Sequence, residues 1–232
     1  MCSVIGALIQ KPTSSDFEFI RKVFLESKIR GMHATGISIV FNNKIVTFKE
    51  ALPADSFVHL NDLKEMVNDD GNLYLIGHCR YSTSDLLYNQ PIANENRSIV
   101  HNGVITQELS ENWDKIFNYK CETKNDSELL LHSDSPLEEY TDASMAVCEL
   151  TSDKKLLVYR NGKRPLYSTS LVNGVIITST ADIPKRAGIK TSAVEVPMNA
   201  YITFDEHMKI NIDFVKTANP DLQKVDYETI SD

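Results

Sequence analysis

Short β-prone segments, separated by turns rich in Asn, Gly and Asp, recur along the whole chain and restrict it to a fold rich in strands. Runs of about four to eight apolar or alternating residues bounded by such turns are typical of strands. The pair Asn42-Asn43, which lies between two of these runs, is typical of a two-residue hairpin turn. Strands are therefore expected over residues 3–9, 36–41, 44–49, 73–77, 97–101, 143–150, 155–159, 166–170, 175–178, 200–204 and 209–214.

Three segments have helical spacing instead. Ser14 or Ser15 can cap a helix over residues 16–28, in which apolar positions recur three and four residues apart. Helices are also expected over residues 105–117 and, with a cap, over residues 126–132. A few helices among many hairpin strands predict an α+β fold, with helices packed on antiparallel sheets. No linker or repeat divides the sequence, so residues 1–232 are expected to form a single domain.

Charge and apolar content argue against several classes of protein. The chain has 24 Lys and Arg against 32 Asp and Glu, a formal net charge of −8, and its basic residues are scattered. Nucleic-acid binding through phosphate neutralisation is therefore not expected. No run approaches the roughly 18 apolar residues that cross a bilayer, and the N-terminus lacks the basic region of a signal peptide, so no membrane association is expected.

The four cysteines are widely and irregularly spaced, at positions 2, 79, 121 and 148. This spacing argues against a disulfide framework or a zinc site and favours a reducing, cytoplasmic location. Cys2 is the most informative of them, because removal of Met1 would place a thiol and a free α-amine on one residue. An α-amine titrates at about 7.7–8.0 and could accept the proton of the thiol. An incidental or buried cysteine is the alternative for Cys2 taken alone.

Three polar clusters lie beside turns, and the first two directly follow apolar runs. Arg80, within residues 77–84, offers a planar guanidinium that suits a carboxylate, or alternatively a structural salt bridge. Asn102 and Gly103 could donate a side-chain and a backbone N–H to an oxyanion, or form a plain turn. Asp126 could bind an ammonium group or cap a helix, and both can hold together.

In this order the motifs resemble the class II glutamine amidotransferase domain, which belongs to the N-terminal-nucleophile (Ntn) hydrolases. The matching segments are residues 2–6, 30–36, 77–83, 90–91, 101–103, 125–128 and 160–166, with a faint match at residues 179–182. Three positions depart from the family pattern. His33 replaces the usual Asp, Ser3 replaces the usual glycine after the nucleophile, and Ser84-Asp85 alters a segment that often covers the active site.

The resemblance implies a four-layer αββα sandwich, with two antiparallel sheets between helices. It also implies the roles of the site residues. Cys2 would be nucleophile and base, and Asn102 with Gly103 would form the oxyanion hole. Arg80, Tyr81, Ser82 and Thr83 would hold the α-carboxylate of the substrate, Asp126 would hold its α-ammonium group, and Arg30 would support the nucleophile.

The implied activity is hydrolysis of L-glutamine to glutamate and ammonia through a thioester on Cys2, without a metal or organic cofactor. Family members usually carry a synthetase domain that consumes the ammonia. Here the 50 residues after Asp182 are expected to complete the same domain, so a separate ammonia-accepting synthetase is the expected partner. Two alternatives stay open: hydrolysis of another γ-glutamyl amide, and a non-catalytic binding module that keeps the fold.

Overall fold

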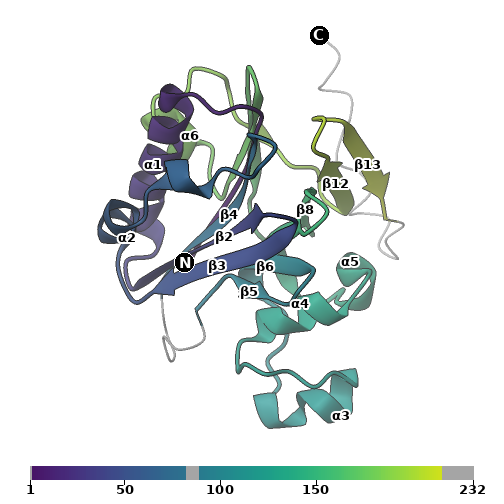
Figure 1. The fold of residues 1–232 in the computed structure, drawn as a ribbon. Coiled ribbons are helices and arrows are strands. Elements are labelled where there is room, and N and C mark those ends of the chain that lie inside the picture. Colours follow the sequence, from purple (N-terminus) through teal and green to yellow (C-terminus); the bar gives the residue numbers. More distant parts are fainter. Residues whose placement is uncertain (1, 82–88, 216–232) are drawn as a thin grey trace.

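Two antiparallel sheets face each other at the centre of this computed structural model, which describes residues 2–81 and 89–215 (Figure 1). One sheet has seven strands, in the order β11 (Val194–Glu195), β9 (Tyr167–Leu171), β10 (Gly174–Thr178), β1 (Ser3–Ile9), β4 (Leu73–Arg80), β2 (Ala34–Phe41) and β3 (Lys44–Glu50). The other has six, in the order β13 (Ile210–Phe214), β12 (Ala200–Phe204), β8 (Leu156–Arg160), β7 (Ser144–Thr151), β6 (Arg97–Val104) and β5 (Ile92–Ala93).

Helices cover the outer face of each sheet. On the seven-stranded sheet lie α1 (Ser14–Ser27), α2 (Ala54–Leu60) and α6 (Asp182–Arg186), with the 3-10 turns η1 (Lys28–Arg30) and η2 (Leu63–Met66). On the six-stranded sheet lie α4 (Leu129–His132) and α5 (Pro136–Glu139), with η5 (Asp126–Glu128). Beyond α4 lie η4 (Ser110–Asn112) and α3 (Trp113–Phe117), whose Trp113 belongs to the same apolar core. In the part of the chain that the structure describes, no helix has the length and apolar content needed to span a membrane.

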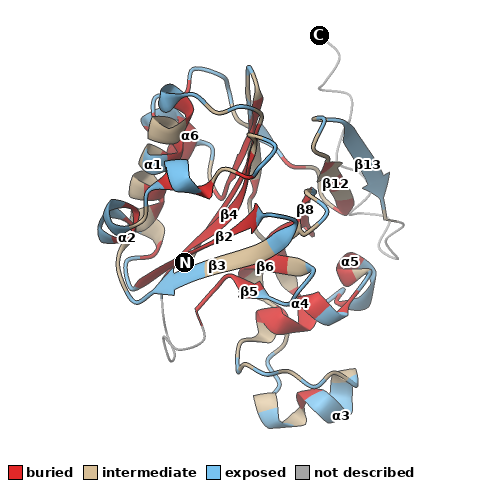
Figure 2. Cartoon of the chain, viewed as in Figure 1, coloured by how far each residue is buried: buried red, intermediate tan, exposed pale blue. Residues whose placement is uncertain are grey.

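Three separate apolar cores hold these four layers together, and the central strands are buried throughout (Figure 2). Strand β1 shows how one strand serves two of them. Ile5, Ala7 and Ile9 face the helices, whereas Val4 and Leu8 face the second sheet. Because side chains alternate between the faces of a strand, a strand buried on both faces must be apolar throughout, as residues 3–9 nearly are. The expected α+β, four-layer αββα architecture is confirmed.

The predicted strands are all present, with shifts of up to three residues at their ends. The hairpin turn at Asn42-Asn43 is also confirmed, because both residues have positive φ, 52° and 55°, as a type I′ turn requires. The helix cap was misplaced. Thr13 caps α1, with its side chain accepting from Asp16 N while Asp16 Oδ2 accepts from Thr13 N, a reciprocal capping box.

The helix predicted over residues 105–117 is wrong in its first half. Only η4 and α3 form, over Ser110–Asn112 and Trp113–Phe117. The residues before η4 are held by contacts outside this segment. Asp126 Oδ2 accepts hydrogen bonds from the backbone N–H groups of Ile105 and Thr106, at 2.6 and 3.3 Å, and holds them against η5. These bonds place residues 105 and 106 but would not by themselves stop a helix, because the first N–H groups of a helix have no partner within it. The helical run is interrupted at Leu109, which is extended, with φ −65° and ψ 140°.

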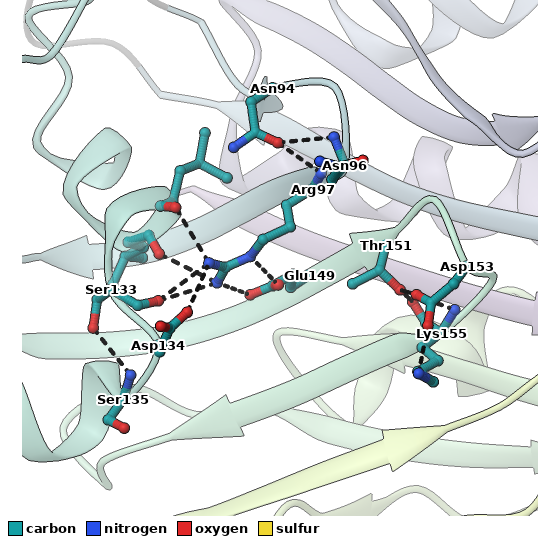
Figure 3. Close-up of polar contacts among 12 residues, drawn as sticks. Asn94, Asn96, Arg97, Ser133, Asp134, Ser135, Glu149, Thr151, Asp153 and Lys155 are labelled. Atoms are coloured by element: carbon teal, nitrogen blue, oxygen red, sulfur yellow. Dashed lines mark hydrogen bonds and ion pairs between the residues drawn. The ribbon is translucent and has the colours of Figure 1, made fainter.

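Arg97 fixes the C-terminal end of α4 against the six-stranded sheet (Figure 3). Its guanidinium forms a bidentate ion pair with the buried Glu149, with distances of 2.6 and 3.0 Å. It also donates to the carbonyl oxygens of Leu130, Leu131 and Ser133. Those carbonyls have no partner within so short a helix, so Arg97 satisfies them and sets the position of η5 and α4.

Candidate active site

Strand alternation aims three predicted site residues into the space between the sheets. Tyr74 and Ile76 of β4, Val4 of β1 and Val100 of β6 belong to the core between the sheets. An even spacing along a strand keeps side chains on the same face. Arg80 follows Ile76 by four residues, Cys2 precedes Val4 by two, and Asn102 follows Val100 by two, so all three are on the inter-sheet side. Ser3 pairs with Cys79, which brings the start of β1 beside the end of β4. The site therefore lies where this inter-sheet layer ends.

A cavity of about 310 Å³ occupies this end of the layer. Six predicted site residues line it: Cys2, Arg80, Tyr81, Asn102, Gly103 and Asp126. Ser82 and Thr83 lie outside the described residues. Arg30 is not among the lining residues, but its Nε donates to the carbonyl oxygen of Cys2 at 3.1 Å and so fixes the backbone beside the thiol. The cavity is at the small end of the range for small-molecule sites, roughly 300–1,000 Å³.

Cys2 is half-buried, and its Sγ lies 3.9 Å from the carbonyl oxygen of Tyr81. The backbone that follows the thiol is anchored at two points. Arg30 holds its carbonyl, and Ser179 Oγ accepts from Val4 N at 2.8 Å. The faint motif at residues 179–182 therefore lies beside the first residues of β1. The resulting arrangement holds the thiol at the cavity wall without burying it.

Asn102 is buried, and its side-chain Nδ2 has no hydrogen-bond partner among the described residues. A buried amide without a partner costs about 1–3 kcal/mol, so such a group calls for an explanation. Because Asn102 lines the cavity, a ligand there could accept this hydrogen bond. The structure thus places an available N–H donor on the same cavity as the Cys2 thiol.

Gly103 belongs to a strand and not to a turn, so the alternative of a plain turn at Asn102-Gly103 is wrong. Strand β6 runs on to Val104 and pairs Gly103 with Met145 of β7. Gly103 has a φ of 153°, and a Cβ added to it would lie 1.8 Å from the carbonyl oxygen of Ser144. Only glycine fits there, for steric reasons that the sequence does not reveal.

A chain of buried hydrogen bonds supports Asn102 and Gly103 from behind. Gln90 Oε1 accepts from His101 N at 2.6 Å, and Gln90 Nε2 donates to Ser127 Oγ at 3.1 Å. Ser127 Oγ lies 2.9 Å from His101 Nδ1, and His101 Nε2 lies 3.1 Å from the carbonyl oxygen of Ser144. A carbonyl only accepts, so Nε2 carries the proton and Ser127 donates to Nδ1. This network joins three of the motifs into one structure.

Asp126 does more than the sequence predicts and is not the helix cap. Asn125 caps η5, with its side chain accepting from Ser127 N at 3.1 Å. One oxygen of Asp126 holds the N–H groups of Ile105 and Thr106, and the residue also lines the cavity. Its carboxylate is therefore held in place at the cavity wall, where it offers a fixed negative charge.

The two histidines near the site are neutral at physiological pH. Burial, with Arg80 and His101 nearby, lowers the pKa of His78 to about 3. Burial also lowers the pKa of His101. Burial likewise lowers the pKa of Arg30, against the opposing influence of Cys2 and Asp182. The charged groups that line the cavity are thus Arg80, Asp126 and Lys124.

Sequence reasoning missed several lining residues, namely Gln90, Thr106, Trp113 and Lys124. Gln90 had a signal, the Gln-Pro pair within the resemblance, but its hydrogen bonds could not be foreseen. Thr106 and Trp113 come from the segment 105–117, which was expected to be one helix, and Lys124 lies in the loop before η5. A larger hollow of about 680 Å³ lies beside α1 and α2, but no cysteine lines it. Size alone therefore does not identify the site.

Comparison with solved structures shows what this arrangement of elements is similar to. The glutamine phosphoribosylpyrophosphate amidotransferase from B. subtilis, complexed with ADP and GMP, matches with a TM-score of 0.72 and 17% identity. The structure described as the allosteric regulatory enzyme of purine biosynthesis matches with a TM-score of 0.72 and 18% identity. Each alignment covers 94% of this chain and 50% of the other.

The chain has a class II glutamine amidotransferase-like, Ntn hydrolase fold. It spans about half the length of the two solved chains it resembles. Comparisons with protein-family models and with curated protein sequences gave no match. At 17% and 18% identity the likeness concerns the fold, and the chemistry of this chain depends on its own residues.

Proposed function

We propose that this protein is a glutaminase in which Cys2, made N-terminal by removal of Met1, hydrolyses L-glutamine to glutamate and ammonia. The observation that carries this proposal is the convergence of Cys2, Arg80, Asn102 and Asp126 on one cavity. Free glutamine is a zwitterion with an amide at its far end. A site for it needs one cation, one anion and a nucleophile with an oxyanion donor, and these four residues supply that set.

In the proposed complex, the Arg80 guanidinium holds the α-carboxylate and the Asp126 carboxylate holds the α-ammonium group. Arg80 is almost fully buried, with 8% of its surface exposed, so its charge acts in a site of low dielectric. Asp126 Oδ2 accepts from the N–H groups of Ile105 and Thr106. The other carboxylate oxygen, Oδ1, would accept from the α-ammonium group. Because Arg80 and Asp126 would hold both ends of the amino-acid group, they would also fix the distance from the side-chain amide of glutamine to the Cys2 thiol.

The reaction would proceed in two halves. The α-amine of Cys2 takes the thiol proton, and Sγ attacks Cδ of the glutamine amide. The negative charge on the amide oxygen is stabilised by Asn102 Nδ2 and the N–H of Gly103. The C–N bond then breaks, and the proton held by the amine leaves with ammonia. Water attacks the resulting thioester, gives its proton back through the amine and releases glutamate, which restores the thiol.

We further propose that the ammonia serves a separate synthetase chain. The glutamine phosphoribosylpyrophosphate amidotransferase from B. subtilis is about twice as long as this chain, which matches half of it. The match supports a module that would supply ammonia to another catalytic unit. Such coupling would appear as an increase in glutamate release when the partner and its acceptor substrate are present.

The test uses protein with its native N-terminus and a C-terminal tag, so that residue 2 is exposed after processing. We expect glutamate and ammonia to be released from L-glutamine in equal amounts. Cys2→Ala should abolish the activity. Cys148→Ala, which removes a buried thiol from the core between the sheets, should retain it. Both variants are checked for folding by circular dichroism.

Three outcomes would overturn the proposal. If wild-type protein releases ammonia from other γ-glutamyl amides but not detectably from glutamine, the site serves a different substrate. If none of these amides is hydrolysed by processed, folded protein, with or without cell extract as a source of partner, the fold carries a binding function instead. Activity that survives Cys2→Ala would also contradict the assigned nucleophile.

A further inference from the structure

Outside the cavity, the structure brings together Cys121, Glu128 and His132, a set that the proposed glutaminase does not use. Their sulfur, oxygen and nitrogen atoms all lie within 4.8 Å of one another. Glu128 is buried, Cys121 is half-buried and His132 is exposed, so the set extends from the interior to solvent. Cysteine spacing could not reveal this cluster, because Cys121 is the one cysteine in it.

We propose that Cys121, Glu128 and His132 bind a divalent transition ion, with Zn²⁺ as the representative. One thiolate, one imidazole and one carboxylate are the three ligand types that zinc takes in proteins. Calcium and magnesium instead take oxygen ligands, of which this cluster offers too few. Three protein ligands leave a fourth position open, and the exposed His132 places that position at the solvent side.

The backbone holds the carboxylate and the imidazole on one face. Glu128 ends η5 and His132 ends α4, which follows it without a break, so the two side chains are four residues apart along one helical stretch. Residues at this spacing are neighbours on a helix surface. Arg97 anchors the carbonyl oxygens of Leu130 and Leu131, so this stretch is fixed to the sheet (Figure 3).

Glu128 also draws Cys121 to the site. Its two carboxylate oxygens accept from the backbone N–H groups of Glu122 and Thr123, each at 2.6 Å. The loop that carries Cys121 is therefore closed onto Glu128 next to the thiol. Each carboxylate oxygen has a second lone pair, so one of them can bind an ion without losing its hydrogen bond. The backbone donors would then orient the ligand from outside the coordination sphere.

The His132 ring is oriented by a stacked neighbour. The Tyr119 ring lies 5.1 Å from it, centroid to centroid, at an interplanar angle of 17°. Tyr119 OH in turn donates to Glu139 of α5 at 3.2 Å. Ligands around a tetrahedral zinc are about 3.3–3.8 Å apart, given bonds of about 2.0–2.3 Å. The observed upper limit of 4.8 Å must therefore contract by about 1 Å, which small rotations of Cys121 and His132 can provide.

The test uses Co²⁺ as a spectroscopic substitute for Zn²⁺, under anaerobic, reducing conditions and without a histidine tag. It is done in Cys2→Ala protein, so that the thiol of the cavity cannot contribute. Cys79 and Cys148 are fully buried, which leaves Cys121 as the accessible thiol among the four cysteines. We expect a cobalt–thiolate charge-transfer band that saturates at one equivalent of Co²⁺ and disappears on addition of Zn²⁺.

Variants then identify the ligands. Cys121→Ser in the Cys2→Ala background should remove the band, and His132→Ala should weaken Co²⁺ binding at least tenfold. His59→Ala, which removes an exposed histidine on α2, should change neither. Absence of a thiolate band in folded protein, or a band that survives Cys121→Ser, would overturn the proposal. Because the assay measures binding in protein that lacks Cys2, its result is independent of glutaminase activity.

Discussion

At the scale of single residues, the amide of Asn102 is the group whose removal separates chemistry from binding. Asn102→Ala should lower kcat for glutamine by about 10²–10³-fold and leave KM within about threefold, because an oxyanion forms only in the transition state. Stability should not fall, since Nδ2 has no partner among the described residues to lose. Steady-state kinetics and urea unfolding measure both quantities. A variant with wild-type kcat would exclude Asn102 from the oxyanion hole.

Arg80 should show the opposite pattern. Arg80→Lys keeps the charge but loses the planar, bidentate fork, so we expect KM for glutamine to rise by at least tenfold with a smaller effect on kcat. Arg80→Met should raise KM further, by about 30-fold or more, because a buried carboxylate loses its charge partner. Initial rates at increasing glutamine concentration measure this. An unchanged KM in both variants would show that another group, such as Lys124 of the same cavity, holds the carboxylate.

Single residues were the part of the site most open to prediction from sequence. Arg80 and Asn102 lie on strands and Cys2 directly precedes β1, so strand alternation relates each of them to core residues of β4, β6 and β1. Their partners were not predictable. Nothing local indicates that Gln90 bonds to His101 and Ser127, or that Asp126 bonds to Ile105, because these contacts depend on how the layers pack.

At the scale of elements, the end of β6 depends on a glycine that no other residue can replace. Gly103→Ala should destabilise the protein by more than about 2 kcal/mol and abolish activity, because the new Cβ would overlap the carbonyl oxygen of Ser144. Gly71→Ala is the matched control. Gly71 also has a positive φ, of 80°, but nothing lies within 4 Å of the added Cβ.

The control should therefore cost only the conformational strain of a left-handed residue, about 1–2 kcal/mol, and should keep the activity. Urea unfolding at fixed pH measures both variants. Equal losses of stability for Gly103→Ala and Gly71→Ala would mean that β6 and β7 can separate locally, contrary to the steric argument.

Elements with a strong period were predicted well and those set by distant contacts were not. Strand β1 and helix α1 follow from their apolar patterns, and the Asn42-Asn43 turn follows from its composition. The segment 105–117 has helical composition, yet Asp126 ties the N–H groups of Ile105 and Thr106 to η5, and the extended Leu109 separates them from the helical residues that follow. The contact of Asp126 with Ile105 and Thr106 joins residues about 20 positions apart, so a local pattern could not reveal it.

At the scale of the whole molecule, four layers enclose neutral histidines whose burial makes stability depend on pH. The pKa of His78 falls to about 3 in the folded state, against about 6.5 when unfolded, and that of His101 is also lowered. Between these values the unfolded chain binds more protons. This contribution to stability is therefore complete above pH 6.5 and declines as the pH falls toward 3.

The free energy of unfolding should thus decrease from pH 7 to pH 5 by up to about 1.4 kcal/mol per pH unit for each buried histidine. Urea unfolding at several pH values measures the slope. His78→Gln should reduce the slope, since one titrating group is lost, whatever its effect on stability at pH 7. A slope of zero between pH 7 and pH 5 in the wild-type protein would contradict the neutral, buried state of both histidines.

The central claim concerns residue 2: a processed N-terminal cysteine reacts with glutamine bound between Arg80 and Asp126. Intact and peptide mass spectrometry after incubation with a diazoketone analogue of glutamine tests it most directly. We predict that Met1 is absent, that one analogue is attached to each chain at Cys2, and that excess L-glutamine prevents the attachment. Protein from its native host that retains Met1, or an adduct that forms elsewhere and is indifferent to glutamine, would contradict the claim.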